Sequence, residues 1–397
     1  MPSSAEQRRA WVGAPLWSFG FRPFFLGGAF WASAAMILWV AMLLGWQGLP
    51  MRLSPLDWHA HEFLFGYLPA ALSGFLLTAI PNWTGRYPIL GKPLMALFLL
   101  WIAGRVVMLC GALLPTGVDV LVEASFLVVL ALVIGREVLA GRNWRNLKVL
   151  GLVGLLAGAN LIFYYELMTV QSASGGVGAR VATATAIMLI VVIGGRIVPS
   201  FTRNWLMKHA PGVREPASFG LADRVTMVLS ALALVGWSAA PDQVITALAC
   251  AIAGICNAVR LMRWQGWQSR GEPLVWILHV GYLFVPLGFL LTACSIVFPE
   301  VLANRASQHS FMVGAVGVMT LAVMTRASLG HTGRMLRASR AVTGIYILAV
   351  VAAFARVFAG ISGAPVWLLH VAAVSWILAF LGFVVVYAPI LAGPRPR

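Results

Sequence analysis

The chain has 397 residues, of which 60% are hydrophobic and only 10% are charged, and its mean hydropathy is +0.89. This composition excludes a soluble globular domain and predicts an all-α polytopic protein of the lipid bilayer. The net charge is +16, but the basic residues are spread over short connections and do not form one patch. We therefore exclude nucleic acid as a partner.

Twelve apolar runs follow one another along the chain, and each is long enough to cross about 30 Å of hydrocarbon as a helix. They predict a single integral membrane domain over residues 1–397, with helices near residues 24–46, 54–80, 94–114, 120–140, 147–168, 179–200, 221–240, 244–263, 274–298, 306–327, 342–361 and 365–391. The second run begins with Ser54-Pro55-Leu56-Asp57, which is typical of a helix start: a serine cap, a proline and then an acid. The longest polar connection is predicted from Phe201 to Phe219.

The distribution of Lys and Arg predicts the topology, because these residues are retained in cytoplasmic loops. With twelve helices, most basic residues fall on one side of the membrane, among them Arg86, Lys92, Arg203, Arg260 and Arg334. The opposite connections contain little beyond Arg52, Arg180 and Arg305. Both termini are therefore predicted to be cytoplasmic.

Four of the seven histidines lie just inside the outer ends of the predicted helices, namely His59, His61, His309 and His370. Ionisable side chains are rare at such depth unless they bind or transfer something. His59 and His61 stand about 200° apart around their helix, so they do not readily bind one ion together. The alternative for each histidine is a hydrogen bond to the backbone of a neighbouring helix.

Helices two and ten align without a gap, which pairs His61 with His309 and Thr84-Gly85-Arg86 with Thr332-Gly333-Arg334. Helix six joins this alignment more weakly. The helices that follow two and ten each contain an arginine, Arg105 and Arg356. A repeat of four helices would relate helices two, six and ten, and it favours three arcs of four helices over the two halves of six that many transporters have.

These residues suit metal cofactors. A b-type haem between two helices needs an inward histidine from each at matching depth, which His61 and His309 provide, and Arg105 and Arg356 would neutralise its propionates. His59 and His370 are the candidate ligands of a copper ion, for which neutral imidazole is a preferred ligand. His279 and His331 have a solvated or capping role as the default and a second site as the alternative, whereas His209 is interpreted as structural or solvated. Solvation at a helix end is the default for three carboxylates, with proton transfer or metal ligation as the alternative: Glu62, Glu123 and Glu166.

The chain resembles the NnrS family over nearly its whole length. The most specific segments are Gly20-Phe21-Arg22-Pro23, Trp58-His59-Ala60-His61-Glu62, Pro81-Asn82-Trp83-Thr84-Gly85-Arg86, Arg196-Ile197-Val198-Pro199 and Gly330-His331-Thr332-Gly333-Arg334. The resemblance implies a multi-pass protein of the bacterial inner membrane, with haem and copper, that serves nitric oxide metabolism, denitrification and defence against nitrosative stress. It does not assign either cofactor to particular histidines.

The helix count and the histidines on helices two and ten also resemble the catalytic subunit of haem-copper oxidases. That resemblance is limited, because those enzymes need several more histidines on helices six and seven, where this chain has none. We expect a histidine-ligated site that binds nitric oxide or exchanges electrons with a redox partner, and whether it catalyses a reaction stays open. The alternatives are a transporter of a metal or small metabolite, and a maturation factor for a respiratory metalloenzyme.

Overall fold

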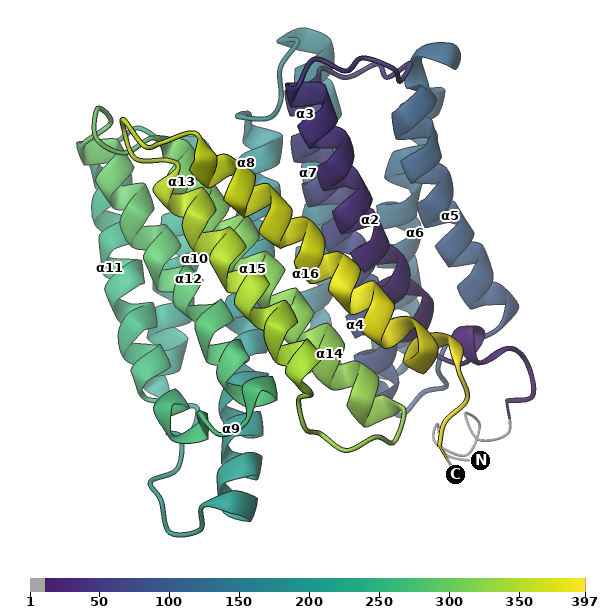
Figure 1. The fold of residues 1–397 in the computed structure, drawn as a ribbon, viewed down its shortest axis with the longest axis vertical. Helices are drawn as coiled ribbons and strands as arrows, with labels where there is room; N and C mark the ends of the chain where they lie inside the picture. The colour runs from purple at the N-terminus through teal and green to yellow at the C-terminus, as the bar shows by residue number, and fades with distance from the viewer. Residues whose placement is uncertain (1–10, 397) are drawn as a thin grey trace. The chain divides into compact units, whose positions relative to one another are not determined.

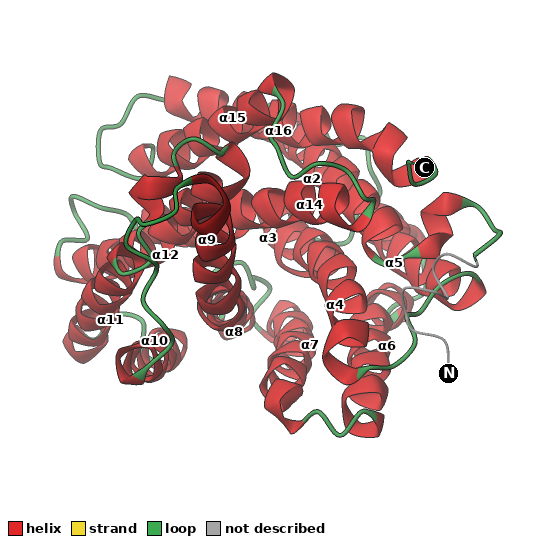
Figure 2. Cartoon of the chain, turned by 90° about the horizontal axis from the view of Figure 1, so that it is seen from below, coloured by secondary structure: helices red, strands yellow, loops and turns green. Residues whose placement is uncertain are grey.

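A computed structural model describes residues 11–396 of the chain, and this part is helical (Figures 1 and 2). It contains twelve helical spans that are long and apolar enough to cross a membrane, which confirms the predicted fold class. The described residues form no strand, and their one isolated β-bridge joins Leu302 to Ile361. The spans are helices because a chain in lipid must satisfy its backbone hydrogen bonds within each segment.

Nine spans are continuous α-helices. They are α2 (Phe21–Leu43), α5 (Lys92–Cys110), α6 (Val118–Ala140), α7 (Leu147–Thr169), α10 (Leu221–Ala239), α11 (Val244–Met262), α12 (Pro273–Val297), α15 (Arg340–Phe358) and α16 (Trp367–Ala392). The third of the twelve spans, α5, continues into a short 3-10 turn, η3 (Gly111–Leu113). Three other short 3-10 turns lie in the connections: η1 (Pro15–Ser18), η4 (Trp144–Asn146) and η6 (Gly266–Ser269).

The second, sixth and tenth spans each contain a π-helical segment between two α-helices. They are α3–η2–α4 (Pro55–His61, Glu62–Tyr67, Leu68–Thr84), α8–η5–α9 (Val177–Leu189, Ile190–Gly194, Gly195–His209) and α13–η7–α14 (Asn304–His309, Ser310–Val318, Met319–His331). The segments η2 and η7 begin directly after His61 and His309, the two residues that the sequence alignment pairs. Because π-helical turns are rare and often mark functional positions, this coincidence supports the kinship of these spans.

The repeated Thr-Gly-Arg segment ends a helix in both places where it occurs. Gly85 and Gly333 have φ angles of +69° and +78°, in the left-handed region where a side chain is strained. The hydroxyl of the preceding threonine donates to a helix carbonyl, from Thr84 to Ile80 O at 2.9 Å and from Thr332 to Ser328 O at 2.6 Å. A shared helix stop therefore explains this part of the internal similarity.

Two compact units make up the chain, and each has its own interior. The described residues of the first unit are 11–182, 327–334 and 383–396, and in it α4 packs on α2 and α6, while α5 and α7 pack on α6. The second consists of residues 183–326 and 335–382, and in it α12 packs on α11 and η7, and α15 packs on η7. The single-domain organisation, the cytoplasmic termini and the three arcs of four helices stay predictions.

Two local predictions can be compared with the structure. The helix start at Ser54 is confirmed, because its Oγ accepts a hydrogen bond from Asp57 N and Pro55 is the first helical residue. The polar connection predicted from Phe201 is wrong at its start, since α9 continues to His209. Val198, Thr202 and Leu206 are buried at helical spacing on the side of α9 that meets α12, so polar residues on the other side do not end the helix.

Candidate functional site

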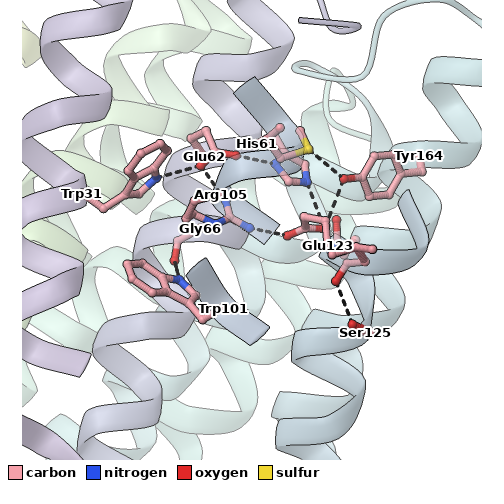
Figure 3. A network of polar contacts seen from close by, with 12 residues as sticks. Trp31, His61, Glu62, Gly66, Trp101, Arg105, Glu123, Ser125 and Tyr164 are labelled. Atoms are coloured by element: carbon pink, nitrogen blue, oxygen red, sulfur yellow. Dashed lines mark hydrogen bonds and ion pairs between the residues drawn. The ribbon is translucent and has the colours of Figure 1, made fainter. Parts of the chain in front are cut away.

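A cluster of buried polar side chains surrounds His61 in the first unit (Figure 3). The His61 side chain is fully buried; its Nδ1 lies 3.2 Å from Glu62 Oε1 and its Nε2 lies 3.4 Å from Glu123 Oε2. The ring also packs against Phe65 and Phe163. Both nitrogens of the imidazole therefore face carboxylates.

Arg105 joins the same two carboxylates from the other side. Its Nη1 donates to Glu62 Oε2 at 2.6 Å and its Nη2 donates to Glu123 Oε1 at 2.7 Å. Neutral groups also donate hydrogen bonds to the two carboxylates. Trp31 Nε1 lies 2.7 Å from Glu62 Oε2, and Asn160 Nδ2 and Tyr164 OH lie 2.8 and 3.1 Å from Glu123 Oε2. Two carboxylates thus face one guanidinium and one imidazole, and the cluster is electrically neutral when the imidazole carries a proton.

The π-helical turn in the second span makes room for this cluster. His61 is the last residue of α3 and Glu62 is the first of η2. Gly66, the last residue but one of η2, lies against the guanidinium of Arg105. A Cβ at Gly66 would collide with Arg105 Nη1, so a side chain at this position would displace the guanidinium from its ion pairs. The Gly66 carbonyl accepts a hydrogen bond from Trp101 Nε1 at 2.9 Å. The backbone of η2 is therefore fixed by the same helix, α5, that supplies Arg105.

The expected solvation of Glu62 and Glu123 at helix ends is wrong, because the two residues are only 0% and 1% exposed. Charged and neutral donors replace the water that would otherwise surround them. Glu166 behaves differently and caps α8, accepting hydrogen bonds from Val177 N at 2.6 Å and Gly178 N at 3.0 Å. Acidic and basic groups at membrane depth are costly and usually functional, which makes the His61 cluster a candidate site.

As arranged here, the His61 cluster does not fit a haem. Axial ligation would need a ring nitrogen of His61 that faces iron, whereas Nδ1 and Nε2 face Glu62 and Glu123. Both Nη atoms of Arg105 are bonded to the same carboxylates, so neither is directed at a propionate. Any haem on His61 would require Glu123 to move away from Nε2.

The equivalent residues of the second unit are arranged differently. His309 ends α13, and its Nδ1 lies 2.7 Å from the carbonyl oxygen of Arg305. A carbonyl oxygen only accepts, so Nδ1 donates and the neutral ring has its lone pair on Nε2, the arrangement typical of metal-binding histidines. Arg356 on α15 has a buried Nη1 without a hydrogen-bond acceptor, and the charge of Arg305 acts on it. The helices α13 and α15 pack together, and Ala303 N donates to Gly360 O at 3.0 Å.

The two candidate copper ligands lie in different units. His59 belongs to the first, where its ring stacks on Trp39 at 4.4 Å between centroids and contacts Phe63. His370 belongs to the second and is exposed on α16. Within residues 11–396, no three His, Cys, Asp or Glu side chains form a group that could hold a metal ion. The assignments of His59, His61, His309 and His370 as metal ligands stay predictions.

A second buried ion pair lies in the second unit and was missed by sequence reasoning, which counted Arg260 among the loop charges. Arg260 is only 1% exposed, and its Nε donates to Asp223 Oδ1 at 2.9 Å. Its Nη1 donates to Val191 O in η5 at 2.9 Å and to Tyr282 OH at 3.1 Å. A buried arginine thus contacts a π-helical segment in each unit. The one sequence feature that could have indicated this ion pair is an acidic residue, Asp223, near the start of an apolar run.

The other histidines have local partners. His279 Nε2 lies 2.8 Å from Thr202 Oγ1, and its Nδ1 is buried without a hydrogen-bond partner. The exposed ring of His209 stacks on Trp205, and its Nδ1 donates to Trp205 O at 3.0 Å, in agreement with the predicted solvated role. His331 is the last residue of α14 and contacts Phe19 and Phe21.

Comparison with known proteins agrees with this description. No curated protein is detectably similar to the chain. The family model described as NnrS protein matches residues 15–395, which is nearly the whole chain. The matched region contains all twelve helical spans, the His61 cluster and the His309 region. The chain therefore belongs to the NnrS family.

Proposed function

We propose that this protein binds or redox-processes nitric oxide at a haem held by His309, and that a copper ion accompanies the haem. Two observations support this role: its family is related to nitric oxide, and twelve of its described helical spans are long and apolar enough to cross a membrane. We place the protein in the bacterial inner membrane, where it would serve denitrification and defence against nitrosative stress.

The buried Nη1 of Arg356 is the observation that carries this proposal. A guanidinium nitrogen that is buried without an acceptor is costly, and an anionic ligand would remove that cost. The positive charge of Arg305 acts on this guanidinium and would add to its attraction for an anion. A haem propionate is an anion of the right kind, and His309 lies on the helix that packs against the helix of Arg356.

His309 has the hydrogen bond that an axial ligand needs. Donation from Nδ1 to the Arg305 carbonyl orients the ring and gives Nε2 the lone pair that would bind iron. A haem bound there would supply a coordination position for a diatomic gas and a one-electron redox centre. Arg305 and Arg356 would hold the propionates.

His61, with Arg105 beside it, stays only a predicted haem ligand, because Glu62 and Glu123 face both nitrogens of its ring. His59 and His370 are proposed as the copper ligands, and Trp39 would fix the orientation of the His59 ring.

Absorption spectroscopy and metal analysis of the purified full-length protein test these assignments. We expect a Soret band that shifts when nitric oxide is added, and loss of the band in His309→Ala. Arg356→Gln should weaken haem retention about ten- to a hundredfold, because a charge-assisted hydrogen bond contributes about 1.5–3 kcal/mol. His59→Ala and His370→Ala should lower the copper content and leave the haem content unchanged.

His209→Ala is the matched control, since His209 has the same Nδ1–carbonyl hydrogen bond but is exposed near the end of α9. An unchanged Soret band in His61→Ala would show that His61 is not an axial ligand. Wild-type haem content in both His61→Ala and His309→Ala would remove the haem assignment altogether. Solute uptake by vesicles that contain the metal-free protein would favour the transporter instead.

A further inference from the structure

A cleft of about 1050 Å³ opens in the first unit beside the Thr84-Gly85-Arg86 segment, away from the His61 cluster. Its rim is the connection of residues 85–90, and its walls come from α5 and α6. Arg86, Arg136 and Glu137 line the polar end of the cleft. The other end is apolar and is lined by Leu97, Leu100 and Val133, among others.

The polar end has an excess of positive charge that one carboxylate only partly balances. Arg86 Nε donates to Glu137 Oε2 at 2.6 Å, and Arg136 Nη2 donates to Glu137 Oε1 at 2.8 Å. The Arg86 and Arg136 side chains are 43% and 66% exposed, whereas that of Glu137 is 8% exposed. The recorded hydrogen bond of Arg86 uses only its Nε, so its two terminal nitrogens can donate to another anion.

The apolar end extends along the membrane spans. Leu100 lies eight residues into α5 from Lys92, which corresponds to about 12 Å along the helix at 1.5 Å per residue. A groove of this depth runs from the level of the basic residues into the hydrocarbon region. A small water-soluble anion would use only its polar end, whereas a lipid would fill both ends.

We propose that this cleft binds an anionic phospholipid of the surrounding bilayer. The phosphate lies at Arg86 and Arg136, and one acyl chain lies between α5 and α6 along Leu100 and Val133. Basic pockets between helices recognise anionic head groups in this way. The basic residues of this region are those for which the sequence predicts the cytoplasmic side, so the ligand is a lipid of the inner leaflet.

Native mass spectrometry of the purified full-length protein in detergent tests the site with phosphatidylglycerol and phosphatidylcholine of identical acyl chains. We expect phosphatidylglycerol to bind about fivefold more tightly, since each interfacial charge contributes about 1 kcal/mol. Arg86→Gln with Arg136→Gln should abolish this preference, and Glu137→Gln should increase it. Leu100→Trp should weaken the binding of both lipids, because it fills the groove.

Arg337→Gln with Arg340→Gln is the matched control, because both arginines are exposed and lie outside the cleft. Arg86→Lys with Arg136→Lys keeps both positive charges and should keep the preference for phosphatidylglycerol. It therefore distinguishes loss of charge from misfolding as the cause of any loss of preference in the glutamine variant. Equal binding of both lipids by the wild type would overturn the proposal. Full displacement of phosphatidylglycerol by inorganic phosphate would also overturn it, because the ligand would then be a free anion.

Discussion

Replacement of Arg105 by methionine would leave Glu62 and Glu123 buried without the guanidinium that bridges them. The guanidinium lies 2.6 and 2.7 Å from these carboxylates, and the three side chains are between 0% and 4% exposed. Removal of one partner from such a buried pair costs about 3–5 kcal/mol, because the remaining charge loses its compensation. With about 2 °C per kcal/mol for a large domain, Arg105→Met should lower the midpoint of thermal unfolding by about 6–10 °C.

A thermal melt followed by size-exclusion chromatography in detergent measures this shift. Arg203→Met is the matched control, since its ion pair with Glu215 is partly exposed, at 31% and 55%, and should contribute at most about 1 kcal/mol. Glu62→Gln and Glu123→Gln, added to Arg105→Met, should recover part of the lost stability by removing the buried negative charges. The reasoning fails if Arg105→Met melts like the wild type, or if the triple variant is no more stable than Arg105→Met.

Two further substitutions test the surroundings of the site and the end of the chain. Gly66→Ala should destabilise the protein by about 1–3 kcal/mol, because its Cβ would collide with Arg105 Nη1. Gly154→Ala in α7 is the control, because an added Cβ there would have no atom of another element within 4 Å. It should be neutral or slightly stabilising in the thermal melt, and equal effects of the two substitutions would contradict the packing argument. Arg22→Met should raise the rate of amide hydrogen exchange near the end of α16 about ten- to a hundredfold, because Arg22 Nη1 donates to Leu391 O in the wild type. Unchanged exchange would refute this anchoring role of Arg22.

The sequence predicts that helices two and ten correspond, but it does not predict the side-chain contacts of their histidines. The alignment paired His61 with His309, and the π-helical segments that begin directly after them support that pairing. Nothing in the sequence indicated that His61 meets two carboxylates while His309 donates to a backbone carbonyl. The partners of these two histidines come from other helices and from the preceding turn, which an alignment of the two spans does not include.

Buried ion pairs were the least predictable feature. Arg260 has the same sequence context as the loop arginines of the predicted cytoplasmic side, yet it is buried against Asp223. Glu123 lies near the predicted start of its helix, where solvation is the ordinary expectation, yet it is buried beside Arg105. Whether a charge near a helix end faces water or a partner depends on the rotation of that helix, and a uniformly apolar span has little periodicity to indicate it.

The sequence by itself determined the twelve apolar spans and the helix start at Ser54. It could do so because lipid imposes long apolar runs, and because caps and helix stops are local chemistry. Only the tertiary structure decided which charges meet around His61, what a side chain at Gly66 would displace, and which guanidinium nitrogen of Arg356 is buried without an acceptor. Those contacts join residues far apart in the chain, so they depend on how neighbouring helices are rotated and at what depth they pack.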